Sequence, residues 1–175
     1  MEKKVELIDG TKAREEDIKA LEEFLGGELP KTYIDFLSKY DGAVPSDNYI
    51  TAESMNDGYA SIRKFVPVLK IIQLTKDIDF IFQNTFPIAE DDCGNFICLD
   101  IRNGHILFWD HEISYSEEDE IYLAEDISQL LSQLVSFPID NSDLDISGAK
   151  IIYSDPEFME QQRKLGNYIE SKKSK

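Results

Sequence analysis

Apolar side chains recur at helical spacing in two stretches near the start of the chain. Residues 14–25 place them on one face and end at Gly26-Gly27, where glycine accepts the left-handed conformation of a helix cap. A second helix is predicted from Pro30, which suits a first helical turn, to about Tyr40. Two helices with one apolar face each need a surface to cover, and we expect a sheet. The apolar positions are Ile18, Leu21, Phe24 and Leu25, then Tyr33, Phe36, Leu37 and Tyr40.

The pattern is weaker in the middle of the chain. Residues 43–60 are rich in Ser, Asn, Asp and Gly and predict a loop with a short strand at 49–51. Residues 62–68 predict a strand that Pro67 confines to an edge or an end. Residues 69–82 fit either a strand or a buried helix, and periodicity alone does not decide between them.

Three strands joined by two turns are predicted next, at 86–89, 95–100 and 106–109. Asn103-Gly104 predicts a two-residue hairpin turn in which both residues have positive φ. The second and third strands are apolar on both faces, which is typical of strands that lie centrally in a sheet with material packed on each side.

After a charged loop at 114–120, a short strand is predicted at 121–124 and a helix from Asp126, whose cap pattern includes Gln129. The fold class is therefore α+β: a mostly antiparallel central sheet, an N-terminal helix pair and a C-terminal helix packed on it. We predict one domain over residues 1–138 and a partly helical extension over residues 139–175. The apolar stripe Phe158–Ile169 is interpreted as folding back onto the domain, with a partner or a second copy as alternatives.

Composition indicates what kind of protein this is and what kind of partner it can bind. The chain has 175 residues, and its hydrophobic fraction of 42% is typical of a globular core rather than of disorder. Its net charge of −17 disfavours direct contact with nucleic acid or an anionic membrane and favours a basic protein partner. We find no signal peptide and no apolar run of membrane-spanning length, so we predict a cytoplasmic protein with both cysteines, Cys93 and Cys98, as thiols.

The negative charge is concentrated in residues 85–126, where twelve acids accompany one basic residue, Arg102. The acids at 90–92 and at 110–112 follow neighbouring or near-neighbouring strands, so we expect them to share one rim of the sheet. The alternative is that these acids only stabilise turns or lie on a solvent-exposed edge, and that Trp109 packs in the core. The candidate partner-binding residues are Glu90, Asp91, Asp92, Trp109, Asp110, Glu112, Glu117, Glu118, Asp119 and Glu120.

Catalytic and metal chemistry find little support in the sequence. The spacing of Cys93, Cys98, His105 and His111 matches no usual zinc site, and the Asp91–Asn95 segment is too short for a calcium loop. The chain has no G-x-S-x-G motif and no glycine-rich phosphate loop. We therefore predict no catalytic residues, no metal and no cofactor, and we treat a carboxylate-dependent hydrolase as a minor alternative.

Several ordered motifs resemble the SUKH superfamily, which joins fungal Smi/Knr-type cell-wall regulators to many bacterial toxin-immunity proteins. The resemblance spans residues 12–135, with Asp41 standing where asparagine is common. The motifs are Leu25-Gly26-Gly27-Glu28-Leu29-Pro30, Tyr33, Phe36-Leu37, Asp41-Gly42, Phe86-Pro87-Ile88-Ala89, Asp92, Gly94-Asn95, Leu99-Asp100 and Trp109-Asp110-His111-Glu112.

The resemblance implies an α+β fold and a non-enzymatic binding role. It implies an immunity protein that neutralises a cognate polymorphic toxin, often a nuclease, by binding the toxin domain. The alternative within the same superfamily is a regulatory or scaffold domain without a toxin partner. The oligomeric state, a monomer or a weak dimer, is left open.

Overall fold

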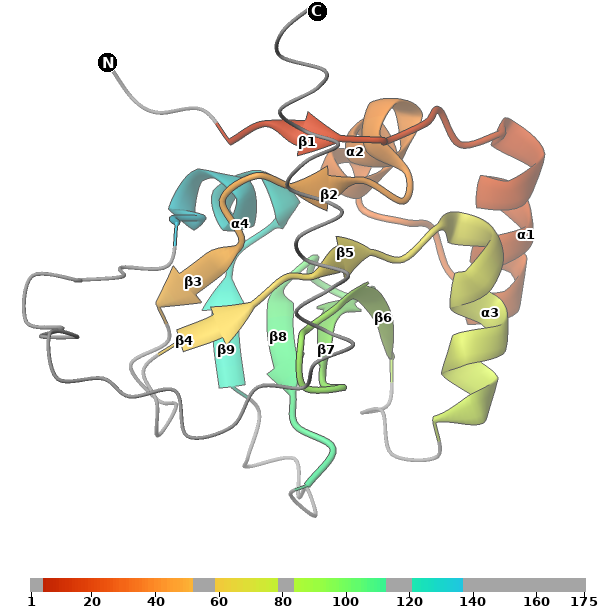
Figure 1. The fold of residues 1–175 in the computed structure, drawn as a ribbon. Helices are drawn as coiled ribbons and strands as arrows, with labels where there is room; N and C mark the ends of the chain where they lie inside the picture. Colours follow the sequence, from red (N-terminus) through yellow and green to blue (C-terminus); the bar gives the residue numbers. More distant parts are fainter. Residues whose placement is uncertain (1–4, 52–58, 79–83, 113–120, 137–175) are drawn as a thin grey trace, which may run out of the picture. The chain divides into compact units, whose positions relative to one another are not determined.

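The computed structural model describes residues 5–51, 59–78, 84–112 and 121–136, and all structural statements concern these residues. Four helices and nine strands are found there (Figure 1). The helices are α1 (Glu15–Leu25), α2 (Lys31–Tyr40), α3 (Val68–Asp77) and α4 (Ile127–Gln133). The strands are β1 (Leu7–Ile8), β2 (Val44–Pro45), β3 (Tyr49–Thr51), β4 (Tyr59–Ser61), β5 (Lys64–Phe65), β6 (Thr85–Glu90), β7 (Phe96–Asp100), β8 (Ile106–Trp109) and β9 (Ile121–Ala124).

The main sheet has five strands in the order β5-β6-β7-β8-β9, and every neighbouring pair is antiparallel. Two small antiparallel pairs, β1-β2 and β3-β4, accompany it. The predicted α+β class with a mostly antiparallel sheet is confirmed. The predicted central strands are β7 and β8, and β7 occupies the middle position of the sheet.

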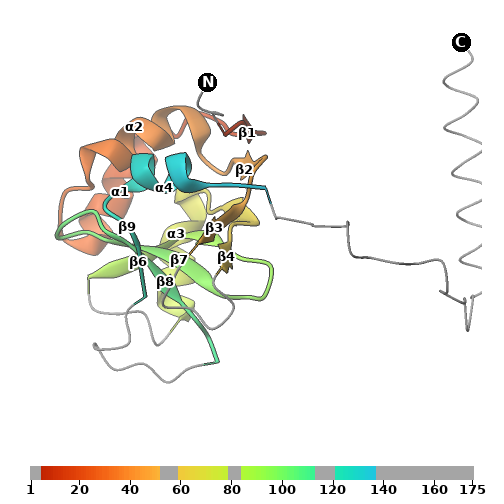
Figure 2. The same ribbon diagram turned by 90° about the vertical axis from the view of Figure 1, so that its left-hand side faces the viewer.

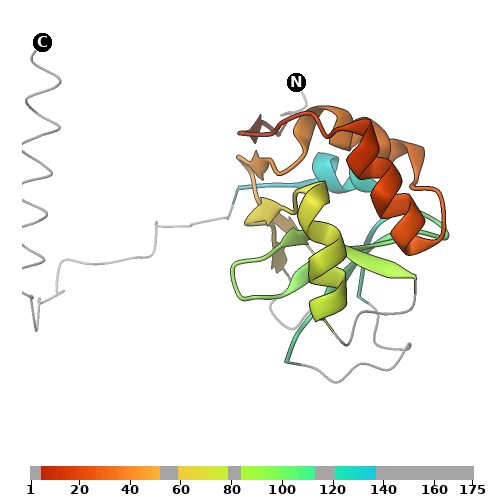
Figure 3. The same cartoon turned by 90° about the vertical axis from the view of Figure 1, so that its right-hand side faces the viewer.

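The helices share one apolar core with the sheet. Helices α1 and α3 lie side by side (Figures 1 and 3), and Figure 2 shows α2 and α4 above strands β6–β9. The Phe36 and Phe65 rings are 4.7 Å apart, and the Tyr33 and Phe86 rings are 5.9 Å apart. Such burial of large apolar side chains is the main force that holds helices on a sheet.

The two faces of β7 have different surroundings. Ile97 and Leu99 belong to the core shared with the helices, whereas Cys98, which points to the opposite face, is also fully buried. The expectation that both faces of this strand are covered is therefore confirmed.

The joint between α1 and α2 packs against the loop that connects β7 to β8. A methyl group placed on Gly27 would lie 3.2 Å from Ile101 Cδ1, and one on Gly104 would lie 3.5 Å from Pro30. The glycines of both segments thus allow a close approach of backbone to side chain. This contact fixes the helix pair at the end of the sheet where that loop lies.

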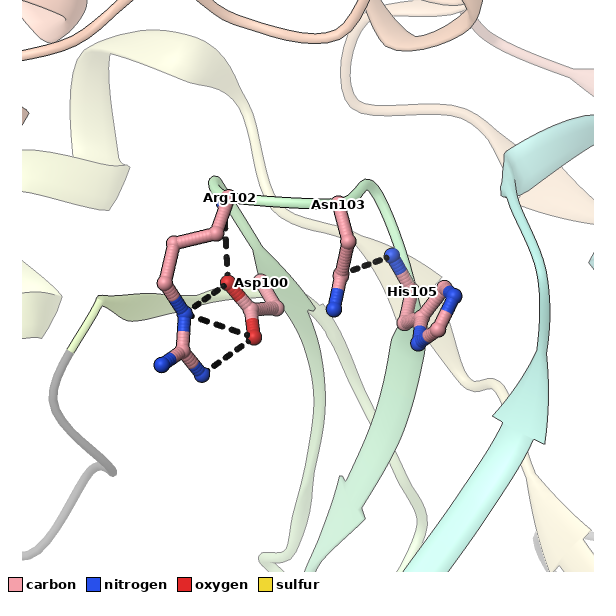
Figure 4. Close-up of polar contacts among 4 residues, drawn as sticks. All are labelled: Asp100, Arg102, Asn103 and His105. Carbon is pink, nitrogen blue, oxygen red and sulfur yellow. Dashed lines mark hydrogen bonds and ion pairs between the residues drawn. The ribbon is translucent and has the colours of Figure 1, made fainter.

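The β7–β8 turn differs from the prediction, because only Gly104 has a positive φ (83°) and Asn103 does not. Side chains stabilise a wider loop instead (Figure 4): Asp100 Oδ1 accepts the Arg102 N–H (2.9 Å), and Asn103 Oδ1 accepts the His105 N–H (2.8 Å). Such hydrogen bonds, from a main-chain N–H to the side-chain oxygen of an Asp or Asn two residues earlier, compete with a tight hairpin turn.

The predicted strand at 62–68 is also wrong in extent. Strand β5 covers only Lys64–Phe65, and Pro67 immediately precedes α3. The ambiguity at 69–82 is resolved as helix up to Asp77, while residues 79–83 lie outside the described residues. The start of α3 is capped from a distance, because Asp41 Oδ1 accepts the Val68 N–H (2.8 Å).

The short strand at 49–51 and the strand at 121–124 are confirmed. Strand β2 and the first two residues of β4 lie within residues 43–60, where the sequence predicts a loop. The capping pattern of α4 is confirmed as well. Asp126 Oδ1 accepts the Gln129 N–H (2.8 Å), and Gln129 Oε1 accepts the Glu125 N–H (2.6 Å). The predicted extension at 139–175 lies outside the described residues, so its boundary stays a prediction.

Candidate protein-binding surface

Strand register brings the two acidic turns to the same end of the sheet. Phe96, the first residue of β7, lies opposite Glu90 of β6 on one side and opposite Trp109 of β8 on the other. The turn that follows Glu90 and the turn that follows Trp109 therefore flank the same strand. With strands about 4.8 Å apart, they are separated by about 10 Å.

Three exposed or half-buried acids belong to these turns in addition to Glu90 at the end of β6. Asp92 and Glu112 are exposed, and Asp110 is half-buried, with its Oδ1 accepting the Glu112 N–H (2.9 Å). We call the surface formed by Glu90, Asp92, Asp110 and Glu112 the acidic rim. The remaining candidates, Glu117, Glu118, Asp119 and Glu120, lie outside the described residues.

Glu90 is partly neutralised by Arg63, which immediately precedes β5. Its carboxylate forms an ion pair with the Arg63 guanidinium, and Lys64 lies directly opposite Glu90 in the sheet. Sequence analysis missed both cations, because the pairing of β5 with β6 was not predicted. The ion pair with Arg63 therefore lowers the net negative charge of the rim.

Asp91 does not face the solvent. It is 5% exposed, and its Oδ1 accepts the N–H groups of Cys93 (2.8 Å) and Asn95 (2.7 Å). Its Oδ2 accepts a hydrogen bond from Asn95 Nδ2 (2.8 Å). The carboxylate thus holds the turn together, and we leave Asp91 out of the surface offered to a partner.

Trp109 is 6% exposed and packs against Phe96, with ring centroids 5.8 Å apart. An aromatic pair across two strands stabilises the sheet. The structure therefore places Trp109 below the rim as a support, in agreement with the alternative interpretation of core packing.

Asn95 and His111 connect the two turns, and neither was among the candidate binding residues. Asn95 Oδ1 accepts the His111 N–H (3.1 Å) and lies 2.7 Å from His111 Nδ1. The signal present in the sequence was that both belong to the quoted motifs, Gly94-Asn95 and Trp109-Asp110-His111-Glu112.

The surface around the first turn is a shallow hollow of about 370 Å³. It is lined by Arg63, Glu90, Asp91, Asp92, Gly94, Asn95 and Phe96. Five of these seven residues are charged or polar, whereas a typical small-molecule site is lined mainly by apolar residues. Such a hollow suits side chains of a protein partner.

Metal binding and the reactivity of the Cys98 thiol are two other chemistries on which the described residues bear. No three His, Cys, Asp or Glu side chains in the described ranges converge as metal ligands. Burial raises the pKa of the Cys98 thiol, which keeps it protonated and unreactive. None of the helices found in the described part of the chain is both long and apolar enough to span a bilayer. What the arrangement supplies is fixed negative charge on a strand-supported surface.

Comparison with known proteins agrees with the motifs. The model of the SMI1/KNR4 family (SUKH-1) matches residues 12–133. A protein of Bacillus subtilis strain 168, the SPbeta prophage-derived uncharacterized protein YokK, is 34% identical over 146 residues, which covers 71% of this chain and 76% of the relative. The resemblance inferred from the sequence is confirmed.

Proposed function

This chain belongs to the SMI1/KNR4 (SUKH-1) family, and we propose that it is a non-enzymatic immunity protein of the cytoplasm. It binds the toxic domain of a cognate polymorphic toxin and covers the active site with the acidic rim. The observation that carries this proposal is the placement of two acidic turns at one end of the sheet, on either side of Phe96.

A nuclease is the toxin class that best complements this surface. A nuclease must hold phosphate groups, so its active-site cleft is rich in Lys and Arg. A partner with a net charge of −17 is attracted to such a cleft over distances beyond direct contact. Close charge pairs then fix the register of the complex.

The bacterial, prophage-derived relative favours immunity over the second role suggested by the family, that of a Smi/Knr-type regulator. Immunity genes are expected beside the genes of the toxins that they neutralise. A regulator needs no such neighbour. The position of this gene beside a large toxin gene with a variable C-terminal domain therefore discriminates between the two roles.

The direct test mixes the purified chain with the toxin domain encoded beside its gene. We expect a stable complex by size-exclusion chromatography and loss of nuclease activity at a one-to-one molar ratio. The toxin domain with an unrelated acidic protein of similar charge is the control. Full nuclease activity in the presence of excess chain contradicts the proposal. Catalytic turnover of any substrate by the purified chain itself contradicts it as well.

A further inference from the structure

A continuous set of hydrogen bonds joins the two acidic turns through one side chain. Asn95 is 9% exposed and lies between Asp91 of the first turn and His111 of the second. It donates through Nδ2 to Asp91 Oδ2 (2.8 Å) and accepts through Oδ1 from the His111 N–H (3.1 Å). Asp91 in turn closes its own loop by accepting the Cys93 and Asn95 N–H groups.

The hydrogen-bond partners of Asn95 determine how its side-chain amide is oriented and which nitrogen of the neutral His111 ring carries the hydrogen. The Asp91 carboxylate can only accept, and the His111 main-chain N–H can only donate, so the two ends of the Asn95 amide are not interchangeable. Because Oδ1 is an acceptor, the contact of 2.7 Å to His111 Nδ1 requires a hydrogen on that nitrogen. The neutral His111 ring therefore carries its proton on Nδ1.

We propose that Asn95 is a positioning residue for partner recognition: its hydrogen bonds to Asp91 and His111 hold the two acidic turns as one preformed docking surface. This inference rests on the proposed function, since it assigns a role within that binding surface. Asn95 adds no charge to the rim. It sets the relative position of Asp92 on one turn and of Asp110 and Glu112 on the other.

Charge and position affect different rate constants. Long-range attraction acts on the association rate and depends on the amount and placement of charge, whereas the fit of preformed contacts acts mainly on the dissociation rate. If the turns move independently, the complex must order them on binding, and affinity is lost. The two effects are separated by a substitution that breaks the network without removing negative charge.

Asn95→Asp is that substitution. It replaces the amide donor with a second carboxyl group 2.8 Å from the oxygen of Asp91, so the N–H···O hydrogen bond is lost. The two carboxyl groups then either repel each other or share one proton, and in neither case is negative charge removed. If attraction of a basic partner were the only effect, Asn95→Asp would associate as fast as the parent or faster and would bind the partner more tightly. The positioning role predicts an unchanged or faster association but about tenfold faster dissociation, which is the effect of losing one buried hydrogen bond.

The chain offers a matched control and a matched rescue. Asn103→Asp makes the same chemical change in the β7–β8 loop, where Asn103 only accepts a hydrogen bond, from the His105 N–H (Figure 4), and a carboxylate can still accept it. The double variant Asp91→Asn/Asn95→Asp exchanges donor and acceptor. The new amide at position 91 donates to the new carboxylate at position 95, and the net charge equals that of the parent.

The experiment measures association and dissociation rate constants for the neighbouring toxin domain with the parent and the three variants. The proposal predicts fast dissociation for Asn95→Asp only, with the parent rate restored in the double variant. It is overturned if Asn95→Asp dissociates like the parent, or if the double variant dissociates as fast as Asn95→Asp.

A measurement on the isolated chain separates this inference from the proposed function. The ¹⁵N shifts of the His111 ring are expected to show the Nδ1–H form in the parent and in the double variant, because position 95 offers an acceptor oxygen to Nδ1 in both. If the ring shows this form but the parent does not bind the toxin domain, the proposed function fails and the network is a feature of the fold alone. If the parent binds but its ring lacks the Nδ1–H form, only the positioning role is overturned.

Discussion

Asp41 and Asp100 show how differently single carboxylates are stabilised in this very acidic chain. Burial would raise the pKa of Asp100, but hydrogen bonds from the Arg102 N–H and guanidinium, together with its charge, hold that pKa below its ordinary value. Burial raises the pKa of Asp41, and the hydrogen bond from the Val68 N–H offsets this only in part. Asp41 is therefore a carboxylate that the folded state holds in its charged form at a cost.

The first prediction concerns Asp41→Asn. The amide oxygen can still accept the Val68 N–H and cap α3, but it carries no charge to desolvate. Because the folded pKa of Asp41 lies above its unfolded value, its penalty is absent below the unfolded pKa and complete above the folded pKa. We expect the melting temperature of the variant to exceed that of the parent by a few degrees at pH 7, with the difference disappearing toward pH 3, as measured by circular dichroism.

Asp35→Asn is the matched control, because it removes one charge from an exposed site on α2. It reports the general relief of charge repulsion in a chain of net charge −17. A gain for Asp41→Asn no larger than for Asp35→Asn shows that burial of the Asp41 carboxylate is not the cause. A loss of stability shows that the charged form is the better cap.

At the scale of elements, α4 is the helix whose start is most fully specified by local sequence. Asp126 and Gln129 form the capping pattern that the sequence predicts, and Leu130 of the same helix is fully buried. We expect Asp126→Ala to lower the free energy of unfolding by about 1 kcal/mol, because the Gln129 N–H loses its acceptor. Urea denaturation measures this loss.

Asp126→Asn serves as the control for that experiment, since an asparagine oxygen caps a helix about as well as an aspartate oxygen. Its free energy of unfolding should stay within about 0.5 kcal/mol of the parent. Equal losses for both variants would point to the charge of Asp126 rather than to its hydrogen bond.

Elements defined by local chemistry could be predicted from the sequence, and those defined by distant partners could not. Helices α1, α2 and α4 follow from their apolar spacing and their terminal residues. Helix α3 was left undecided because the residue that caps it, Asp41, is 27 positions away. The β7–β8 turn was predicted too tight, because the Asn103-Gly104 signal competes with hydrogen bonds made by Asp100.

The same limit applies to the candidate surface. The predicted strands were enough to place the acids at 90–92 and 110–112 at the ends of neighbouring or near-neighbouring strands, and the structure places them after β6 and β8, on either side of β7. Which of these side chains face inward depends on tertiary contacts, as the burial of Asp91 and Trp109 shows. The ion pair of Glu90 with Arg63 could not be predicted without knowing that β5 pairs with β6.

At the scale of the whole molecule, total charge and its placement make separate contributions. A net charge of −17 attracts any basic protein, and it does so less at physiological salt, where charges are screened over about 8 Å. Specificity requires that particular acids meet particular cations of the partner. The account therefore depends on the acidic rim making a larger contribution than acids elsewhere on the surface.

The most direct measurement is the association rate constant with the toxin domain, determined at several salt concentrations for two charge-matched variants. Asp92→Asn/Glu112→Gln neutralises two acids of the rim. Glu23→Gln/Glu28→Gln neutralises two exposed acids beside Gly27, which packs on Ile101 at the other end of the sheet. We predict that the rim variant associates several-fold more slowly with a shallower salt dependence, while the other variant behaves like the parent. Equal behaviour of the two variants would contradict the assignment of the acidic rim as the binding surface.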